Sequence, residues 1–559
     1  MMQEPGRDYQ RMRGHHPGVP EAITEGMHAD SVRVPMLPLF PEHSDVYSRG
    51  KEYWIRQLID MREGSLTYID LFAGCGGLSL GLEKAGFELL LAVEKSEMAA
   101  ETFYHNFINR LPDGLAGNRA WAEYLNLDIG EQAARRLIVN EVAAVLREDG
   151  LLDRLRQREV DLVAGGPPCQ GFSMAGRRNP EDARNQLPWQ FLEFVERLAP
   201  KAVLIENVVG IGQDFVKYGS EAPFGQLRLA LEETEPGYVV QPMRVNAMHY
   251  GVPQHRPRML LVGLRQDIAE SFGLRKGLEL WRSEDRLPPP LLAPKPTTRD
   301  APLTVYDALW DLVDGPDGRL SYIAPPDSDM YEADRGHYAW SMRCDPWWLP
   351  PALPEALPPR TPRNGTLRKH TPQIEERFRL YQYLQSAGIK PNILNVPADP
   401  ALRPLEQMAI VRQVLSSAPM PAFSPDGTCL AQTLDELVPV VMRLGTKKHS
   451  QRPLRADLPS PTVMSLPDDF VHHRMPRTLT VREMARLQSF PDNFEFRSKE
   501  TTGSHRRRVE VPQYTQVGNA VPPLLALALG RQLSRLLRGE NERRANDLYV
   551  RWQASECNL

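Results

Sequence analysis

A cysteine in a proline-stiffened loop is the most reactive candidate in the chain. Cys169 stands in Gly165-Gly166-Pro167-Pro168-Cys169-Gln170-Gly171-Phe172-Ser173, directly after the apolar run Asp161–Ala164. Open α/β sheets place ligands at the carboxyl ends of strands, and a stiff loop there can present a thiolate as a nucleophile. Residue type alone favours a structural role, because most lone cysteines are small buried hydrophobes. The position of the loop is what favours nucleophilic chemistry.

A glycine-rich turn predicts a nucleoside-type ligand. The segment Asp70-Leu71-Phe72-Ala73-Gly74-Cys75-Gly76-Gly77-Leu78-Ser79 ends an apolar run and opens a helical pattern, and Glu94 closes the next apolar run. Glycines allow a ligand to approach the backbone closely, and an acid at that place can bond ribose hydroxyls. The spacing is neither G-x-G-x-x-G nor a Gly-Lys-Ser/Thr loop, so a phosphate cradle is not indicated. A purely structural turn is an equal alternative for this motif on its own. We expect Asp128 and Ile129 at the end of the third strand, where they would add an acceptor and an apolar contact.

Two further segments place charged groups at strand ends. In Ile205-Glu206-Asn207-Val208, Glu206 could act as a general acid if burial raised its pKa, and a salt-bridged or capping glutamate is the alternative. In Gln254-His255-Arg256-Pro257-Arg258, the two arginines alternate and are expected on one side of an extended segment. They could bind phosphate or substrate oxygens, or form a solvated face. His255 has no evident partner, and we interpret it as non-catalytic.

The elements that must hold these residues alternate along residues 67–264. Short apolar runs predict buried parallel strands at Thr67–Phe72, Leu89–Val93, Asp161–Ala164, Ala202–Ile205 and Met259–Leu264. Helical patterns lie between them, among them Leu78–Ala85 and Met98–Asn109. The alternation predicts an α/β fold with a doubly wound sheet.

Proline marks the organisation of the rest of the chain. The sequence holds 51 prolines in 559 residues, and 16 of them fall between Pro288 and Pro362. Because proline removes a donor and breaks helices, this segment is expected to be loop and turn. Regular structure is expected to return at Pro372–Ala387, Thr480–Ser489 and Val521–Leu537. We therefore expect a largely disordered leader (1–65), a first catalytic segment (66–265), an irregular insert (266–450), a second catalytic segment (451–540) and a tail (541–559).

Composition excludes several classes of protein. Hydrophobic residues make up 42% and charged residues 25%, which excludes wholesale disorder and collagen, and a net charge of −4 excludes a uniformly basic, histone-like binder. No apolar stretch is long enough to span a bilayer, and the polar N-terminus has no signal-peptide core. The five cysteines are dispersed with no C-x-x-C pair, which disfavours a disulfide framework and a zinc site. We expect a cytoplasmic protein that binds no metal.

Six motifs in order resemble those of the prokaryotic-type DNA (cytosine-5) methyltransferases. They are DLFAGCGG, GGPPCQGFS, ENV, QHRPR, RTLTVREMARLQSFPD (Arg477–Asp492) and QVGNAVPP (Gln516–Pro523), spread over residues 66–264 and 451–537. The resemblance implies a Rossmann-like S-adenosylmethionine-dependent methyltransferase domain, with a smaller, irregular target recognition domain in the insert. It implies methyl transfer to carbon 5 of a cytosine in a specific duplex DNA sequence, within a restriction–modification or phage-defence system that could include a cognate endonuclease. A tRNA cytosine-5 methyltransferase and a catalytically silent DNA-binding regulator are the alternatives.

The resemblance also implies roles for single residues. Cys169 would attack carbon 6 of an extruded cytosine, and Glu206 would bond ring nitrogen 3. Arg258 would hold the base oxygen and help to fix Glu206, with Arg256 nearby. For S-adenosylmethionine, the resemblance implies that Phe72 packs against the adenine and that Asp128 and Ile129 contact its edge. Glu94 would bond the ribose, and Pro168 would form a wall of the pocket. The methionine part would be surrounded by Gly74, Gly76, Gly77, Leu78 and Asn519. Lys95 stands where relatives often carry an aromatic residue that stacks on the adenine.

The resemblance further implies a DNA-binding surface. The loop Ser173–Asn185, with Arg177, Arg178 and Arg184, resembles a mobile loop that closes over DNA. Basic runs at Arg443–Arg455, Arg360–Lys369 and His505–Arg508 are candidates for phosphate contact. The segment between Phe496 and Gln513 is longer than family members usually need, and the resemblance implies no role for it.

Overall fold

The computed structural model describes residues 65–148, 150–168, 186–212, 223–323, 337–353, 359–448, 451–503, 506 and 509–539. Several predictions from the sequence fall outside these residues. They concern the leader as far as residue 64, Cys169, the loop Ser173–Asn185, His505, Arg507, Arg508 and the tail 541–559.

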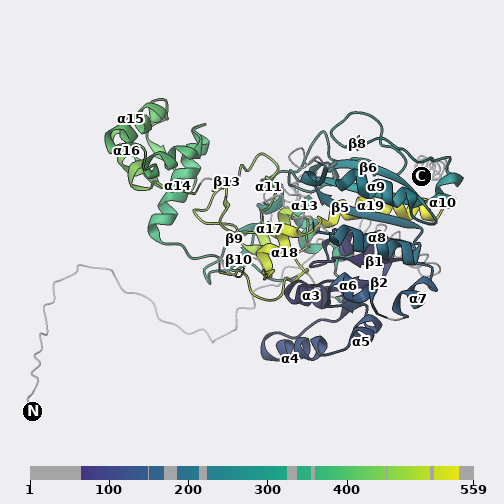
Figure 1. The fold of residues 1–559 in the computed structure, drawn as a ribbon. Helices are drawn as coiled ribbons and strands as arrows, with labels where there is room; N and C mark the ends of the chain where they lie inside the picture. The colour runs from purple at the N-terminus through teal and green to yellow at the C-terminus, as the bar shows by residue number, and fades with distance from the viewer. Residues whose placement is uncertain are drawn as a thin grey trace, which may run out of the picture. The chain divides into compact units, whose positions relative to one another are not determined.

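Eight strands form one mixed sheet in the order β3-β2-β1-β4-β5-β7-β6-β8 (Figure 1). The pairs that join β3 through β5 are parallel, whereas β7 runs antiparallel to both β5 and β6. The strands are β1 (Leu66–Leu71), β2 (Phe87–Val93), β3 (Leu137–Ile138), β4 (Leu162–Gly165), β5 (Ala202–Val208), β6 (Tyr238–Asn246), β7 (Pro257–Arg265) and β8 (Trp281–Arg282).

The predicted strands are all present, but the prediction that Met259–Leu264 is parallel is wrong. This run is the centre of β7, and it pairs antiparallel because only ten residues connect it to β6, too few for a crossover helix. We did not predict β6, since Gln241, Pro242 and Arg244 interrupt its apolar run. The two-residue β3 carries no recognisable pattern at all.

Helices cover both faces of the sheet, as a doubly wound fold requires. Alternate strand residues point to opposite faces, so Tyr68 contributes to one core and Ile69 to the other. The first core includes α2 (Gly77–Lys84), α3 (Glu97–Phe103), the π-helical turn η1 (Tyr104–Ile108), α4 (Gly114–Leu125), α17 (Val481–Leu487), α18 (Gln513–Asn519) and α19 (Pro523–Leu537). The second includes α6 (Val142–Leu146), α7 (Leu151–Arg156), α8 (Leu187–Leu198) and α9 (Pro223–Glu233).

The two halves of the catalytic fold meet where α2 packs on α19. In Figure 1 the yellow α19 lies among strands and helices from the first half of the chain. The contact is so close that a Cβ atom added to Gly81 would lie 2.4 Å from the Cβ of Ala526 and 2.5 Å from the carbonyl oxygen of Pro523. The side chain of Gln516 adds a polar contact, accepting from the Thr102 hydroxyl at 2.7 Å and donating to the Met98 carbonyl at 3.0 Å. The C-terminal segment therefore completes the fold that residue 66 begins.

Residues 266–450, expected as one insert, divide between two hydrophobic cores. Its first part packs into the same core as β1 and α2, through side chains such as Leu309 and Trp348. A separate core joins α14 (Pro372–Ser386), α15 (Pro404–Leu415) and α16 (Leu434–Arg443), which form one helical group in Figure 1. The remaining elements are α5 (Ile129–Ala134), η3 (Val209–Gly212), η5 (Ala247–Tyr250), α10 (Gln266–Ser271), α11 (Val305–Leu309), β9 (Leu312–Asp314), β10 (Leu320–Tyr322), α13 (His337–Cys344), η6 (Pro346–Trp348), η7 (Pro391–Ala398), β11 (Ala422–Phe423), β12 (Cys429–Ala431), β13 (Arg452–Pro453) and β14 (Phe470–Val471). None of the described helices is long and apolar enough to cross a membrane.

Buried arginines fasten the first part of the insert to α17. Arg486 is fully buried, and its guanidinium bonds both Asp492, at 2.6 and 2.7 Å, and Asp311, at 3.1 and 3.2 Å. Arg477 joins Asp314 of β9 to Glu483 of α17 in the same way. Such bidentate pairs are satisfied only in one arrangement, so they define how the insert packs on the catalytic fold.

Replacing Gly81 by alanine should destabilise the protein. The added methyl group has to displace the backbone of α19, and overpacking of this kind costs about 1–3 kcal/mol. Chemical denaturation of the variant should therefore show a lower free energy of unfolding. Gly225 in α9 is the matched control, since an added Cβ there meets nothing within 4 Å and Gly225→Ala should be neutral or stabilising. Equal stability of the two variants would contradict the close α2–α19 contact.

Candidate active site

The glycine-rich turn after β1 combines tight packing with one open position. Phe72, Gly74 and Gly76 all have positive φ, at 61°, 58° and 98°. A Cβ added to Gly76 would lie 2.3 Å from the Phe107 ring, and one on Gly77 would lie 2.3 Å from the Val521 carbonyl oxygen. A Cβ on Gly74 would meet nothing within 4 Å. Gly76 and Gly77 are therefore required by packing, whereas the Gly74 backbone faces free space that a ligand can enter. Phe72 has a left-handed backbone conformation, which is strained for a residue other than glycine and is often found at functional sites.

Glu94 links this turn to the end of β2. One of its carboxylate oxygens accepts the Gly74 N–H at 2.8 Å, and the other accepts the Ser96 N–H at 2.7 Å. Burial raises the pKa of Glu94, and these two N–H donors partly offset that effect. Each oxygen can accept a further hydrogen bond, so the carboxylate suits a pair of hydroxyl groups.

Asp128 and Ile129 do not lie at the end of a strand, so that prediction is wrong. Asp128 caps α5: its exposed carboxylate accepts the Glu131 N–H at 2.7 Å while Glu131 accepts the Asp128 N–H at 3.2 Å. The D-x-x-E spacing is the signal of a capping box, and it could have identified this helix start. The strand beside β2 is β3, whose Ile138 carbonyl accepts the Glu94 N–H at 3.1 Å. Val139 and Asn140 follow that strand instead.

Lys95 turns toward this same strand end. Its ammonium group lies 2.5 Å from the Glu141 carboxylate, and both side chains are exposed. Lys95, which stands where relatives often carry an aromatic residue, therefore forms an ion pair between the segments that follow β2 and β3.

Glu206 and Arg258 form a buried ion pair at the ends of neighbouring strands. The Nε atom of Arg258 lies 2.7 Å from Oε1 of Glu206, and the two side chains are only 9% and 11% exposed. Next to Glu206, the Asn207 amide donates to the Pro167 carbonyl at 2.9 Å. A Cβ on Gly166 would lie 3.3 Å from the second Glu206 carboxylate oxygen. The end of β5 thus holds the loop that leads through the exposed Pro168 to Cys169.

Arg256 is not available to a substrate, which corrects the role predicted for it. Its side chain is 1% exposed, and its guanidinium donates to the carbonyl oxygens of Gly518 and Ala520, both at 2.9 Å. Arg256 stands just before β7, which begins at Pro257, and its guanidinium is bonded to the C-terminal turn, whereas Arg258 reaches Glu206. Arg256 is a positioning residue that anchors the C-terminal turn.

This anchored turn presents Asn519 at the surface. Asn519 lies between the two carbonyls that Arg256 holds and is exposed, while Gly518 and Val517 are buried. The Gln488 amide supports the turn by donating to the Val517 carbonyl at 2.7 Å, and Gln254 in turn bonds Gln488 at 2.9 Å. Sequence reasoning did not assign a role to Gln254 or Gln488, although Gln254 opens the QHRPR motif.

A cavity of about 650 Å³ opens beside the catalytic strand and is lined by basic side chains. Its basic residues are His255, Lys390, Lys448 and Arg452, all exposed, and Asp469 is the acid among the lining residues. The Thr462 hydroxyl donates to the His255 carbonyl at 2.8 Å and ties the cavity to the segment that enters β7. His255, which we interpreted as non-catalytic and without a partner, faces this cavity. We call this set of residues the basic groove.

The described residues contain no group of three or more His, Cys, Asp or Glu side chains that could hold a metal ion. The described part of the site consists of the glycine-rich turn with Glu94, the Glu206–Arg258 pair and the turn that carries Asn519.

Comparison with known proteins places this geometry in a family. The C-5 cytosine-specific DNA methylase family matches residues 66–116, 124–335 and 405–535. The Type II methyltransferase M.DdeI of Desulfomicrobium norvegicum is 29% identical over 470 residues, covering 84% of this chain and 88% of the relative. The Type II methyltransferase M.AgeI of Thalassovita gelatinovora is 30% identical over 493 residues, covering 83% and 98%. M.XorII of Xanthomonas oryzae pv. oryzae, also a Type II methyltransferase, is 30% identical over 485 residues, covering 85% and 86%.

The family match includes every segment that builds the site, from the glycine-rich turn to α19. The α/β fold expected from the motif series is confirmed, and so is the resemblance itself. The chain belongs to the C-5 cytosine-specific DNA methylase family and is a DNA cytosine-5 methyltransferase.

Proposed function

We propose that this enzyme transfers a methyl group from S-adenosylmethionine to carbon 5 of a cytosine within a specific duplex DNA sequence, as part of a restriction–modification system. The observation that carries the proposal is the buried Glu206–Arg258 pair, held beside the Pro167–Pro168 loop that leads to Cys169. Several Type II methyltransferases are among the relatives that cover most of the chain, which supports the restriction–modification role. A cognate endonuclease is the partner that such a system would supply.

The first step is nucleophilic attack by Cys169. Carbon 5 of cytosine is a weak nucleophile, and addition of the Cys169 thiolate to carbon 6 forms a covalent adduct whose carbon 5 is enamine-like. Negative charge that develops at ring nitrogen 3 during the attack is met by Glu206, which bonds or protonates that nitrogen. Arg258 holds Glu206 at 2.7 Å, and we assign to it the contact with the base oxygen. After carbon 5 accepts the methyl group, it loses its proton and Cys169 is expelled; no base is assigned to that proton.

The residues around the glycine-rich turn fit S-adenosylmethionine. The space over Gly74 admits a ligand next to the backbone, and the Glu94 carboxylate offers acceptors for the two ribose hydroxyls. Phe72 and Pro168 supply apolar surface, the Leu78 side chain is buried in the core so that only its backbone is left for the ligand, and the exposed Asn519 is assigned to the polar end of the methionine part. When bound, the cofactor supplies the methyl group. The Val139–Asn140 segment at the end of β3 replaces Asp128 and Ile129 as the neighbour of the adenine edge.

The target base must leave the helix to reach this buried pair. Stacked in a duplex, a cytosine cannot expose carbon 6 to a cysteine, so the enzyme extrudes the base into its site. The basic groove lies along the segment entering β7 and presents Lys390, Lys448 and Arg452 to a phosphate backbone. Lys448 and Arg452 belong to a basic run that we predicted for phosphate contact. The groove therefore supports binding of the strand that carries the extruded base.

Cys169→Ser should abolish methyl transfer and leave DNA binding intact, because a serine hydroxyl is a far weaker nucleophile than a thiolate. Incorporation of tritiated methyl groups into duplex DNA measures the first property, and a gel-shift assay measures the second. Cys429→Ser is the matched control, since Cys429 is exposed and stands in β12, outside the six motifs, and it should keep full activity. Turnover by Cys169→Ser at the rate of the parent enzyme would refute the covalent mechanism.

Glu206→Gln should slow the chemical step by about 10²–10⁴-fold, the usual contribution of a positioned acid or base. Glutamine can still accept from Arg258, so the affinity for S-adenosylmethionine should not change. Single-turnover kinetics measure the rate, and Glu193→Gln in α8 is an exposed control of equal charge change. An unaltered rate for Glu206→Gln would remove the assigned role.

A triple variant of the basic groove should bind all duplex sequences more weakly, and its affinity should depend less on salt. The three substitutions are Lys390→Gln, Lys448→Gln and Arg452→Gln. Each lost phosphate contact lowers the slope of log affinity against log salt by about 0.9. Fluorescence anisotropy over a range of salt concentrations gives this slope. Arg154→Gln/Arg156→Gln/Arg158→Gln removes the same charge from exposed positions in and after α7. If both triple variants changed the slope equally, the basic groove would not be the DNA contact.

A further inference from the structure

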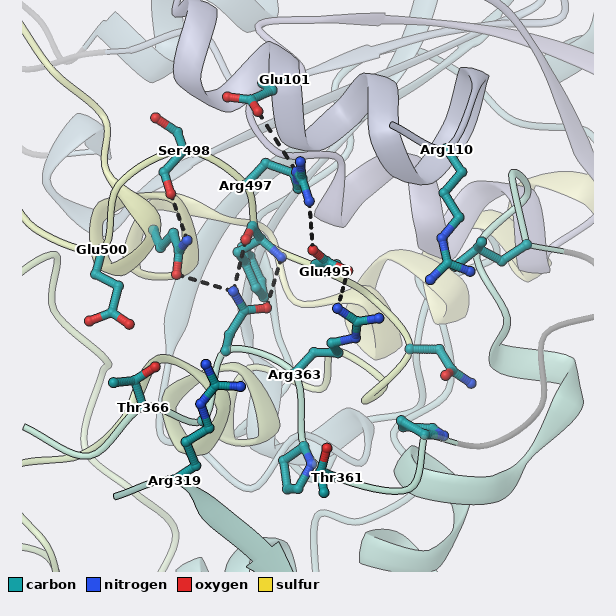
Figure 2. A pocket seen from close by; sticks show the side chains of 18 of the residues that line it. Glu101, Arg110, Arg319, Thr361, Arg363, Thr366, Glu495, Arg497, Ser498 and Glu500 are labelled. Atoms are coloured by element: carbon teal, nitrogen blue, oxygen red, sulfur yellow. Dashed lines mark hydrogen bonds and ion pairs between the residues drawn. The ribbon is translucent and has the colours of Figure 1, made fainter. Parts of the chain in front are cut away.

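A second cavity, of about 820 Å³, is lined by three segments that are far apart in the sequence (Figure 2). They are the α3–α4 region, the insert around residues 319 and 359–366, and the segment from Asn493 to Gln513. Five arginines and three glutamates line it, and none of these eight residues belongs to the methyl-transfer site or to the basic groove. The part of the wall formed by residues 359–366 lies outside the residues that the family model matches.

Two of the five arginines are already paired. Arg497 lies 2.8 Å from Glu495, 3.0 Å from Asp113 and 3.7 Å from Glu101. Arg363 shares two of these acids, at 3.6 Å from both Asp113 and Glu495. Figure 2 shows these side chains meeting near the middle of the cavity. Arg363 and Arg497 are therefore ion-paired with Glu101, Glu495 and Asp113.

The remaining arginines have no acid to balance them. Arg110, Arg319 and Arg360 are exposed, and no carboxylate of the described residues lies within ion-pair distance of them. In Figure 2, Arg110 and Arg319 enter from opposite sides with Arg363 between them. Glu500 is the one lining acid that no described cation pairs. With Asp113 counted beside the lining residues, five arginines face four carboxylates, and the excess positive charge lies on the unpaired Arg110, Arg319 and Arg360 in a concave wall.

We propose that this cavity is an anion site that binds phosphate groups. Guanidinium groups bind phosphate oxygens in pairs through their planar forks, and the hydroxyls of Thr361 and Thr366 add neutral donors to the lining. The walls offer little apolar surface for a base, since Phe496 is buried and the other lining side chains are mostly polar. Phosphate is therefore the chemistry recognised, and its source is either the phosphodiester backbone of DNA or a free polyphosphate.

The site explains the long segment between Phe496 and Gln513. Arg497, Ser498 and Glu500 from this segment line the cavity, and the Arg497 N–H donates to the Thr102 hydroxyl at 2.8 Å. An ion pair of 2.5 Å between Lys499 and Glu510 holds the two ends of the segment together. The start of this segment therefore builds one wall of the anion site. The inference does not depend on the methyl-transfer mechanism, because no catalytic residue takes part.

Calorimetric titration of the full chain with sodium tripolyphosphate at constant ionic strength tests the site. Arg110→Gln/Arg319→Gln/Arg360→Gln should weaken binding at least tenfold, and Glu500→Gln should tighten it. None of the four substituted side chains is buried, so the substitutions should not disturb the core packing. Thermal melting checks that the variants fold. The matched control is Arg154→Gln/Arg156→Gln/Arg158→Gln, which should bind as the parent does. Absence of binding to the parent chain, or equal binding by both triple variants, would overturn the proposal.

Duplex DNA distinguishes the two sources of phosphate. If the DNA backbone occupies the site, Arg110→Gln/Arg319→Gln/Arg360→Gln also lowers affinity for a 30-base-pair duplex relative to the control triple variant. If a free polyphosphate is the ligand, that variant loses tripolyphosphate binding and keeps its DNA affinity. Either result supports the anion site, and arginine-independent binding of both probes contradicts it.

Discussion

The hydrogen bonds from the buried guanidinium of Arg256 to the carbonyl oxygens of Gly518 and Ala520 are the interaction on which the site depends. Burying a charge is costly unless hydrogen bonds satisfy it, and such charge-assisted bonds contribute about 1.5–3 kcal/mol each. No described carboxylate lies within ion-pair distance of Arg256, so these main-chain contacts hold it. Asn519 stands between the two carbonyls, and Arg258 follows two residues after Arg256. One side chain therefore sets the position of the C-terminal turn and of the strand that carries half of the catalytic ion pair.

The packing of α19 on α2 performs the same function on a larger scale. Glycines at the contact allow backbones to approach, and Gln516 connects the C-terminal segment to α3. The glycine-rich turn lies between these contacts, with Gly77 against Val521. The cofactor region is thus built from both ends of the described chain, and neither half can form it alone. This arrangement explains why the motif series is split by the insert.

Much of the fold could be predicted from the sequence, because buried parallel strands appear as short apolar runs that end at glycine, proline or charge. The direction of β7 could not, since local pattern does not record which neighbour a strand pairs with. Asp128 was misplaced because a capping box and a strand end both present an acid before an apolar residue. The burial of Arg256, Arg482 and Arg486 was also invisible, because arginine normally marks a solvated face and only tertiary partners reverse that. The contact between Glu206 and Arg258, by contrast, was expected and is present.

The net charge of −4 conceals a strongly uneven distribution of cations. Basic side chains gather in the basic groove beside β7 and in the arginine-lined cavity, whereas others are neutralised, as Arg443 is by Glu376. The proline-rich part of the insert is likewise not one uniform loop: it contributes Leu309 and Trp348 to the catalytic core. Charge and proline content therefore describe surfaces and segments, and only the structure shows which of them meet.

Bisulfite sequencing of host DNA after expression of the intact chain tests the central claim most directly, because the reaction is defined by a methyl group on carbon 5 of cytosine in a fixed sequence context. The account predicts conversion-resistant cytosines at one recurring duplex motif in expressing cells and none at that motif in cells without the gene. Complete conversion at all sites, or resistant cytosines with no common surrounding sequence, would contradict it.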